Sequence, residues 1–357
     1  MIISLIRIKQ RILVAFFFLM VKINTCFSVS AITNDFWPGL FGDNISLYRK
    51  TKWFAHKYNL KFLYRPFVHS EELCMHRLEI PYDSDQEKRY SKKILLKNER
   101  DINENADALY VCQWSTQLND ESRLEMLTDL DFVNNIKSLI KPLKPVIIEF
   151  LRDRISVAVH IRRYTGSEES TYFFLEDEYE IDDSGVQSPK IADQYATDKC
   201  YRAFPMTMRF LPVKYYVDQL QKLYKLLDDK KLYVFIFSDV KNPEEIVRCF
   251  EKYCKEYDII FDCRRTGNNH KDFVVEDFWA MTNFDCLLRP ASNFSINVQY
   301  FGNHKLIITP GDSYWANGKL IVDNVKITIK EPQKMAASSF QFNHPNRDLE
   351  RLLKQIF

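Results

Sequence analysis

The chain has 357 residues, of which 46% are hydrophobic and 14% aromatic, so it can bury a sizeable core and general disorder is disfavoured. Acidic and basic residues nearly balance at a formal net charge of +2, which argues against a strongly basic nucleic-acid binder. The eight cysteines include no Cys-x-x-Cys pair, which excludes the common zinc-ribbon and thioredoxin signatures. These numbers are typical of an α/β enzyme with one or two domains.

Residues 1–30 have the order of a secretory signal: a basic stretch ending at Arg11, the apolar run Ile12–Val21, and small residues near Ser28–Ala31. The apolar run is shorter than the roughly 20 residues that span a bilayer. Three alternatives stay open, namely a cleaved signal peptide, an uncleaved signal anchor and a buried element. A signal predicts the secretory pathway or export, with membrane attachment only through an N-terminal anchor.

The first half of the chain is expected to contain a loop, a helix and a strand in that order, as part of a βαβ unit. The corresponding segments are the glycine-punctuated loop 38–44, the helix 45–58 and the strand 60–67. The polar residues 82–107 predict a surface excursion. Helical spacing over 127–150 is interrupted by Pro142 and Pro145.

The second half alternates strands with helices, which predicts a parallel, doubly wound sheet. The expected strands are 155–159, 232–237, 259–261, 286–288 and 305–309, and the expected helices are 215–227, 243–257, 276–283 and 296–301. Asn242 and Pro243 have the residue types of a helix cap and first position. A boundary near residue 150 would divide the chain into domains 31–150 and 151–357.

Polar residues follow two of the expected strands at the edge where ligands bind in open α/β sheets. His160, Arg162 and Arg163 follow the first strand, and arginine side chains there offer paired donors for phosphate oxygens. Ser238 and Asp239 follow the second strand. An exposed basic turn explains the first group equally well, and an ordinary turn explains the second.

The segment Ser292–Ser295 precedes a helix, where hydroxyl and backbone N–H groups can bind an anion. Ordinary helix capping is the alternative. The loop around Gly42 could bring its backbone close to a phosphate. The triplets Asp83–Asp85 and Asp129–Asp131 could hold a divalent metal beside a diphosphate, but neither follows a strand.

Four segments resemble the GDP-fucose-dependent fucosyltransferase superfamily, both in their residues and in their order along the chain. Members of that superfamily form α1,2, α1,6 and protein O-linkages. They are Val157–Arg163, Val234–Asp239, the stretch from Glu276-Asp277 to Ser295, and the glycine loop Gly39–Asn44. Some positions differ from the family's pattern: Thr165 replaces an aspartate, Asp43-Asn44 replaces Asn-Gln, and Ile296-Asn297 replaces an aromatic pair. The resemblance covers roughly residues 38 to 310.

The resemblance implies a GT-B-like α/β fold, in which two Rossmann-like domains enclose a cleft. Residues 31–150 would form the acceptor-side domain, and residues 151–357 the nucleotide-sugar domain. The implied activity is metal-independent, inverting transfer of fucose from GDP-fucose to a glycan or glycoprotein. No other cofactor is expected.

The resemblance also implies roles for individual residues. Arg162 would neutralise the β-phosphate, with Arg163 assisting or structural, and Asp43 is the candidate base for the acceptor hydroxyl. His160 and Asp277, or Glu276 in its place, would hold the guanosine. The remaining donor-binding candidates are Gly42, Asn44, Ser238, Asp239, Ser292, Asn293, Phe294 and Ser295.

Two other readings of the sequence stay open. One is a GT-B transferase that uses another nucleotide sugar. The other is a catalytically degenerate module that binds a sugar or nucleotide, which the replacement at Thr165 favours.

Overall fold

The computed structural model describes residues 30–35, 39–103, 107–163, 179–182, 211–265, 272–316, 319–330, 337–341 and 347–357. The expected signal segment therefore lies outside the described residues, apart from Ser30, and so does Thr165. Within the described part of the chain, no helix combines the length and the apolar character needed to cross a membrane.

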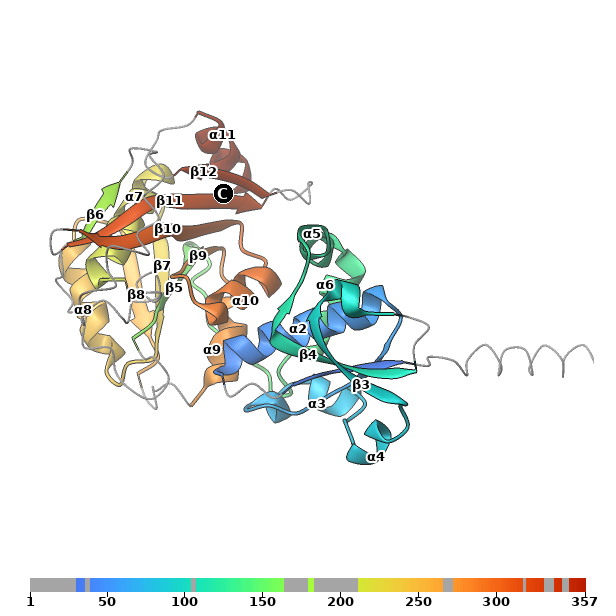
Figure 1. The fold of residues 1–357 in the computed structure, drawn as a ribbon. Helices are drawn as coiled ribbons and strands as arrows, with labels where there is room; N and C mark the ends of the chain where they lie inside the picture. The colour runs from blue at the N-terminus through green and yellow to red at the C-terminus, as the bar shows by residue number, and fades with distance from the viewer. Residues whose placement is uncertain are drawn as a thin grey trace, which may run out of the picture. The chain divides into compact units, whose positions relative to one another are not determined.

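The chain divides into two compact units (Figure 1). The first comprises residues up to 38, 46–67 and 75–136, and the second comprises 39–45, 68–74 and 137–357. The continuous part of the second unit thus begins at Lys137, whereas the sequence predicts a boundary near residue 150. The connecting residues pack within that unit: Lys137 donates to Asn303 over 3.1 Å, and the rings of Phe150 and Phe284 lie 5.0 Å apart.

The first unit contains a parallel sheet in the order β2-β1-β4-β3. Its strands are β1 (Ala31–Asn34), β2 (Lys61–Leu63), β3 (Lys92–Asn98) and β4 (Ala108–Gln117). The prediction of a surface excursion over 82–107 is wrong for the part of this range that forms β3. It is an edge strand in which Leu96 is the one buried residue, so its composition is polar although its backbone pairs with β4.

The helices of this unit begin with α2 (Phe41–Lys57), whose first turn belongs to the second unit. The others are α3 (Met75–Leu78), α4 (Ser84–Glu87), α5 (Asp120–Thr128) and α6 (Leu130–Leu139), with 3₁₀ turns η1 (Ser70–Glu72, counted with the second unit) and η2 (Glu99–Asp101). Tyr48 of α2 packs edge-on against Phe62 of β2, and Trp53 packs against Phe132 of α6. α2 therefore covers the sheet with an aromatic face, as its spacing predicted.

The second unit contains a larger sheet in the order β12-β11-β10-β9-β5-β7-β8, with β6 beside β11. Its strands are β5 (Ile155–Ile161), β6 (Tyr179–Asp182), β7 (Leu232–Ser238), β8 (Ile259–Cys263), β9 (Cys286–Leu288), β10 (Leu306–Ala316), β11 (Lys319–Lys330) and β12 (Ala337–Gln341). The run from β10 to β8 is parallel. The expected α/β class is confirmed, and the strands predicted in the second half pair in parallel as expected.

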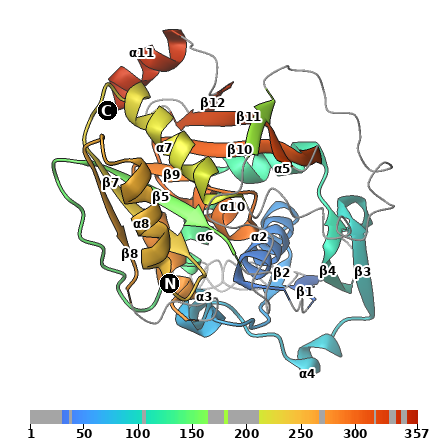
Figure 2. The same cartoon turned by 90° about the vertical axis from the view of Figure 1, so that its left-hand side faces the viewer.

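Helices lie on both faces of this sheet: α7 (Val213–Leu226), α8 (Pro243–Tyr253), α9 (Val274–Met281) and α10 (Asn293–Phe301). Figure 2 shows α7 and α8 crossing in front of the sheet, with α10 behind it. Val157, Val159 and Ile161 of β5 face the core under α7 and α8, so the alternate residue His160 faces the other side. Asn242 occupies the position before α8, but its side chain makes no capping hydrogen bond.

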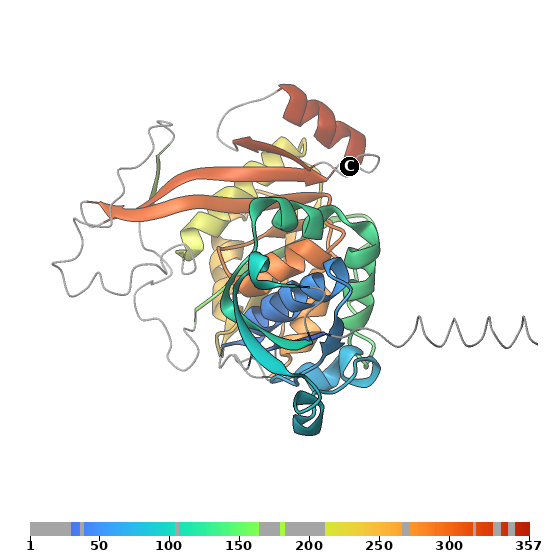
Figure 3. The same cartoon turned by 45° about the vertical axis from the view of Figure 1, so that its right-hand side comes forward.

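The long hairpin β10–β11 and the strand β12 add antiparallel pairs to one edge (Figure 3). The sequence predicted a last strand ending at Thr309, and the structure continues it to Ala316. The C-terminal helix α11 (Arg347–Ile356) buries Leu349 and Leu353 in the core that also contains α7.

Candidate anion site at the strand ends

Arg162 lies directly after β5, and its Nη1 donates to Oγ of Ser292 over 3.3 Å. Ser292 is fully buried and occupies the position before α10, yet its side chain does not cap that helix. The first turn of α10 therefore begins with a guanidinium group beside it instead of a side-chain cap. Guanidinium groups and helix N-termini both favour negative charge, so this arrangement suits an anion. The structure thus brings together two residues expected to bind phosphate.

His160 is buried beside this turn, with its ring 5.4 Å from that of Phe294. Phe294 in turn packs edge-on against Phe278. Burial, and then the charges of Arg162 and Arg289, lower the pKa of His160 to about 3. The imidazole is therefore neutral, and its Nδ1 has no hydrogen-bond partner within the described structure.

Gly42 lies in the first turn of α2 and not in an open loop as predicted. A Cβ at this position would lie 2.4 Å from the backbone nitrogen of Phe294, so only glycine fits. The close approach expected at this glycine is therefore real, but the partner in the structure is the start of α10. Whether a phosphate also reaches Gly42 stays a prediction.

Polar contacts join the same two helix starts. Nδ2 of Asn293 donates to Oδ1 of Asp43 over 2.6 Å, and Nδ2 of the fully buried Asn297 donates to the carbonyl of Gly42 over 2.9 Å. Asn44 is also buried and donates to the carbonyl of Gly39. Asp43, the candidate base, is thus positioned by the segment that carries the serines.

Ser295 is fully buried, and its Oγ donates to the carbonyl groups of Pro290 and Ser292 at 3.5 and 3.3 Å. Its hydroxyl therefore shapes the turn before α10. On the neighbouring strands, the main-chain N–H of Arg163 donates to Oδ1 of Asp239 over 2.7 Å, and Ser238 is buried at the end of β7. This contact ties the end of β5 to that of β7, and donor binding by these residues stays a prediction.

Asp277 lies in α9, where its Oδ1 accepts from Nη2 and Nε of Arg264 at 2.6 and 3.2 Å. Burial raises the pKa of Asp277 to about 6, although Arg264 opposes that shift. Phe273 occupies the capping position of α9, so Asp277 does not cap this helix. Glu276 also lies near Arg264, at 3.4 Å.

A cavity of about 320 Å³ opens beside this ion pair. Its lining combines aromatic, acidic and basic side chains: Tyr233, Phe235, Phe237, Asp262, Arg264, Glu276 and Ala280, with the segment 145–149. The floor of aromatic rings and the flanking carboxylates could accept a flat group with N–H donors. Arg264 and the cavity could not be predicted from the sequence, because residues from β7, β8 and α9 line the cavity together.

Each Asp-x-Asp triplet contributes a residue that accepts a backbone N–H group at the start of a helix. Asp83 caps α4 through the N–H of Asp85, and Asp129 accepts from the N–H of Phe132 at the start of α6. Among the described residues, no group of three histidine, cysteine or acidic side chains could hold a metal ion. Asp83 and Asp129 thus have a capping role in the structure.

Sequence reasoning also missed Arg289, which directly follows β9. It is half-buried, and burial lowers the pKa of its guanidinium to about 10. The rule that selected Arg162, an arginine after a buried strand, would have selected Arg289 as well.

No protein-family model matches the chain, and no curated protein matches it either. Among solved structures, it is similar to an Arabidopsis thaliana FUT1 variant in complex with GDP, with a TM-score of 0.49, 12% identity, and 81% of this chain and 72% of that chain covered. POFUT1 in complex with GDP-fucose gives a TM-score of 0.40, 11% identity, and coverage of 77% and 94%. The fucosyltransferase NodZ from Bradyrhizobium gives 0.38, 10%, and coverage of 85% and 99%.

Proposed function

We propose that the protein is a glycosyltransferase that moves fucose from GDP-fucose to a hydroxyl group of a glycan or a protein. The observation that carries this proposal is the guanidinium of Arg162 on Ser292, beside the uncapped start of α10. Transfer from a nucleotide sugar leaves a diphosphate, whose negative charge must be neutralised as the bond breaks. An arginine at a helix start can supply that charge without a metal.

In the proposed reaction, the acceptor oxygen attacks the anomeric carbon while the bond from that carbon to the β-phosphate oxygen breaks. The electron pair goes to the diphosphate at Arg162, and direct displacement inverts the anomeric centre. The acceptor proton needs a base. Asp43 is the proposed base, because the contacts that the structure describes engage only its Oδ1 and leave Oδ2 for a proton.

The proposed guanosine site lies at the cavity beside α9. Glu276 lines it and lies 3.4 Å from Arg264, whereas Asp277 accepts from Arg264 over 2.6 Å and does not line the cavity. A carboxylate that accepts guanine N–H groups would favour GDP over UDP, because an analogue without those donors leaves the carboxylate unpaired. Glu276 is therefore the stronger candidate of the two for the base contact.

Donor hydrolysis and calorimetry with GDP-fucose, GDP-mannose and UDP-sugars test the proposal without knowledge of the acceptor. We expect GDP-fucose to be hydrolysed and bound most tightly, with activity retained in EDTA. Preference for a UDP-sugar would identify another nucleotide-sugar transferase. Tight binding without turnover, with any acceptor preparation, would indicate a degenerate binding module. Loss of activity in EDTA, restored by manganese, would contradict the metal-free mechanism.

Export through residues 1–30 also remains a proposal. A fusion of these residues to a reporter, compared with a fusion that starts at Ala31, should deliver the reporter to the secretory pathway. Retention of both reporters in the cytosol would contradict it.

A further inference from the structure

Arg289 carries a charge that no acidic side chain neutralises within the described residues. Its Nε donates to Oε1 of Gln299 over 2.6 Å, and its Nη1 donates to the carbonyl of Pro290 over 3.0 Å. Both acceptors are neutral. Two other arginines of the same unit differ in this respect: Arg264 pairs with Asp277 and Arg154 pairs with Asp258, each at 2.6 Å.

The partners of Arg289 position it without cancelling its charge. Gln299 belongs to α10, so its amide oxygen orients the guanidinium relative to that helix. A glutamate there would have formed an ion pair, whereas the amide leaves the full positive charge. Keeping an unpaired cation half-buried costs stability, and such a cost is typical of a functional site.

Arg162 and Arg289 contact the same short turn, Pro290–Ser295. Arg162 donates to the hydroxyl of Ser292, and Arg289 donates to the carbonyl of Pro290, which also accepts from Ser295. His160 lies close enough that both charges act on it, and it stays neutral. The turn that begins α10 is therefore flanked by two guanidinium groups.

We propose that Arg289 is a second phosphate-binding residue, which acts with Arg162 on the diphosphate of the nucleotide donor. This inference rests on the proposed function and extends it. A departing diphosphate carries more negative charge than one guanidinium neutralises. Two arginines on one turn would share that charge between the two phosphates.

Calorimetry of Arg289→Gln and Arg289→Lys with GDP, GMP and guanosine tests the inference. A phosphate contact predicts a graded loss: roughly 10- to 100-fold for GDP in Arg289→Gln, less for GMP, and no more than about twofold for guanosine. Arg289→Lys should lose less GDP affinity, because lysine retains the charge and loses the paired donors. A purely structural role would not produce this dependence on phosphate number.

Arg154→Gln is the matched control. Arg154 is a half-buried arginine just before β5, where its Nη1 contacts the carbonyl groups of Leu232 and Asp258. This variant should melt earlier and keep GDP affinity.

Unchanged GDP affinity in folded Arg289→Gln would overturn this inference but not the proposed function. Equal losses of affinity for GDP and for guanosine would have the same consequence. If Arg289→Gln does not fold, the loss of GDP affinity relative to the loss of guanosine affinity is measured in Arg289→Lys instead, and that ratio decides. A folded wild-type protein without GDP affinity would overturn both the inference and the proposed function.

Discussion

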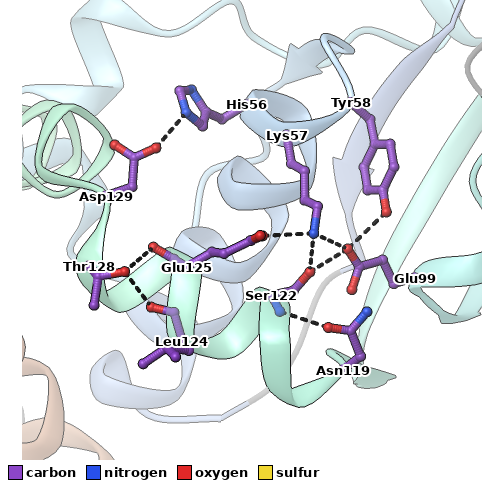
Figure 4. A network of polar contacts seen from close by, with 10 residues as sticks. All are labelled: His56, Lys57, Tyr58, Glu99, Asn119, Ser122, Leu124, Glu125, Thr128 and Asp129. Carbon is purple, nitrogen blue, oxygen red and sulfur yellow. Dashed lines mark hydrogen bonds and ion pairs between the residues drawn. The ribbon is translucent and has the colours of Figure 1, made fainter.

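One charged side chain in each unit shows a different treatment of charge removed from water: Lys57 in the first unit and Arg289 in the second. In the first unit, Lys57 forms ion pairs with Glu99 at 3.1 Å and Glu125 at 2.8 Å, and donates to the hydroxyl of Ser122 at 2.6 Å (Figure 4). Tyr58 and Ser122 also donate to Glu99. In the second unit, Arg289 donates to two neutral acceptors, Gln299 and the carbonyl of Pro290, and to no acidic group among the residues that the structure describes. A network that balances its charges stabilises a fold, whereas the unbalanced charge of Arg289 at a strand end is the reason for proposing that it binds a phosphate.

The largest effect is expected from Arg162→Lys, which should lower turnover of GDP-fucose by at least about 100-fold. Lysine keeps the charge but loses the paired donors that suit phosphate. Steady-state hydrolysis of the donor measures the effect. Arg154→Lys, at the other end of the same strand, should keep near-normal turnover. Equal turnover in the two folded variants would show that Arg162 has no special role in the proposed reaction.

Glu99→Gln should lower the free energy of unfolding by about 3 kcal/mol and leave GDP affinity unchanged, because it breaks a buried pair in the balanced network. Burial would raise the pKa of Glu99, but hydrogen bonds from Ser122, Tyr58 and Lys57 outweigh it and lower the pKa below 4.5. This stabilisation is present above pH 4.5 and is lost as pH falls through the folded pKa. Urea unfolding at pH 7 and at a series of lower pH values measures both effects, and the difference between wild type and variant should shrink as the pH falls through the folded pKa of Glu99. A variant as stable as wild type at pH 7 would contradict the assignment.

Gly42→Ala should cost about 1–3 kcal/mol of stability and also weaken GDP binding, since the new methyl group would push the start of α10 away. Gly302→Ala is the control at the other end of α10, where the added methyl group would meet the ring of His304. It should lower the melting temperature without changing GDP affinity. Equal GDP affinity in both variants would mean that the contact with Gly42 is structural only.

The smallest effect concerns Asp277. Its pKa of about 6 exceeds the ordinary 3.8, so its contribution favours folding below pH 3.8 and is lost as pH rises through 6. Between pH 5 and pH 7, wild type should lose about 1 kcal/mol more stability than Asp277→Asn. Urea unfolding at the two pH values decides. Parallel pH profiles would show that Arg264 keeps this carboxylate charged throughout.

Local pattern was enough to predict the centre of the second unit. The apolar runs of β5, β7 and β9 are buried on both faces, so their composition alone identifies them. Arginine and serine at their ends were found by the same reasoning. α7 was predicted to within two residues at its start, because its buried face repeats at helical spacing.

Other features could not be predicted because they depend on distant partners. The polar edge strand β3 is recognisable only through its pairing with β4. Asp43 and Asn293 are 250 residues apart in sequence, and no local rule relates them. The sequence predicts a loop at Gly42, because no local pattern shows that its small size lets the start of α2 pack closely against the start of α10. The ion pair of Asp277 with Arg264 likewise joins two separate elements, and the distance between these residues in the sequence does not predict that they are in contact.

The contact between the starts of α2 and α10 has a consequence for directed evolution of this protein. Asp43 and Asn297 both make contacts across this one interface. Asn297 is fully buried, so an aromatic ring introduced there alone would have to displace the segment around Gly42. Libraries that vary these positions singly would therefore be dominated by inactive clones. Combinatorial libraries over 42, 43, 293 and 297 would allow substitutions that compensate one another to be recovered together.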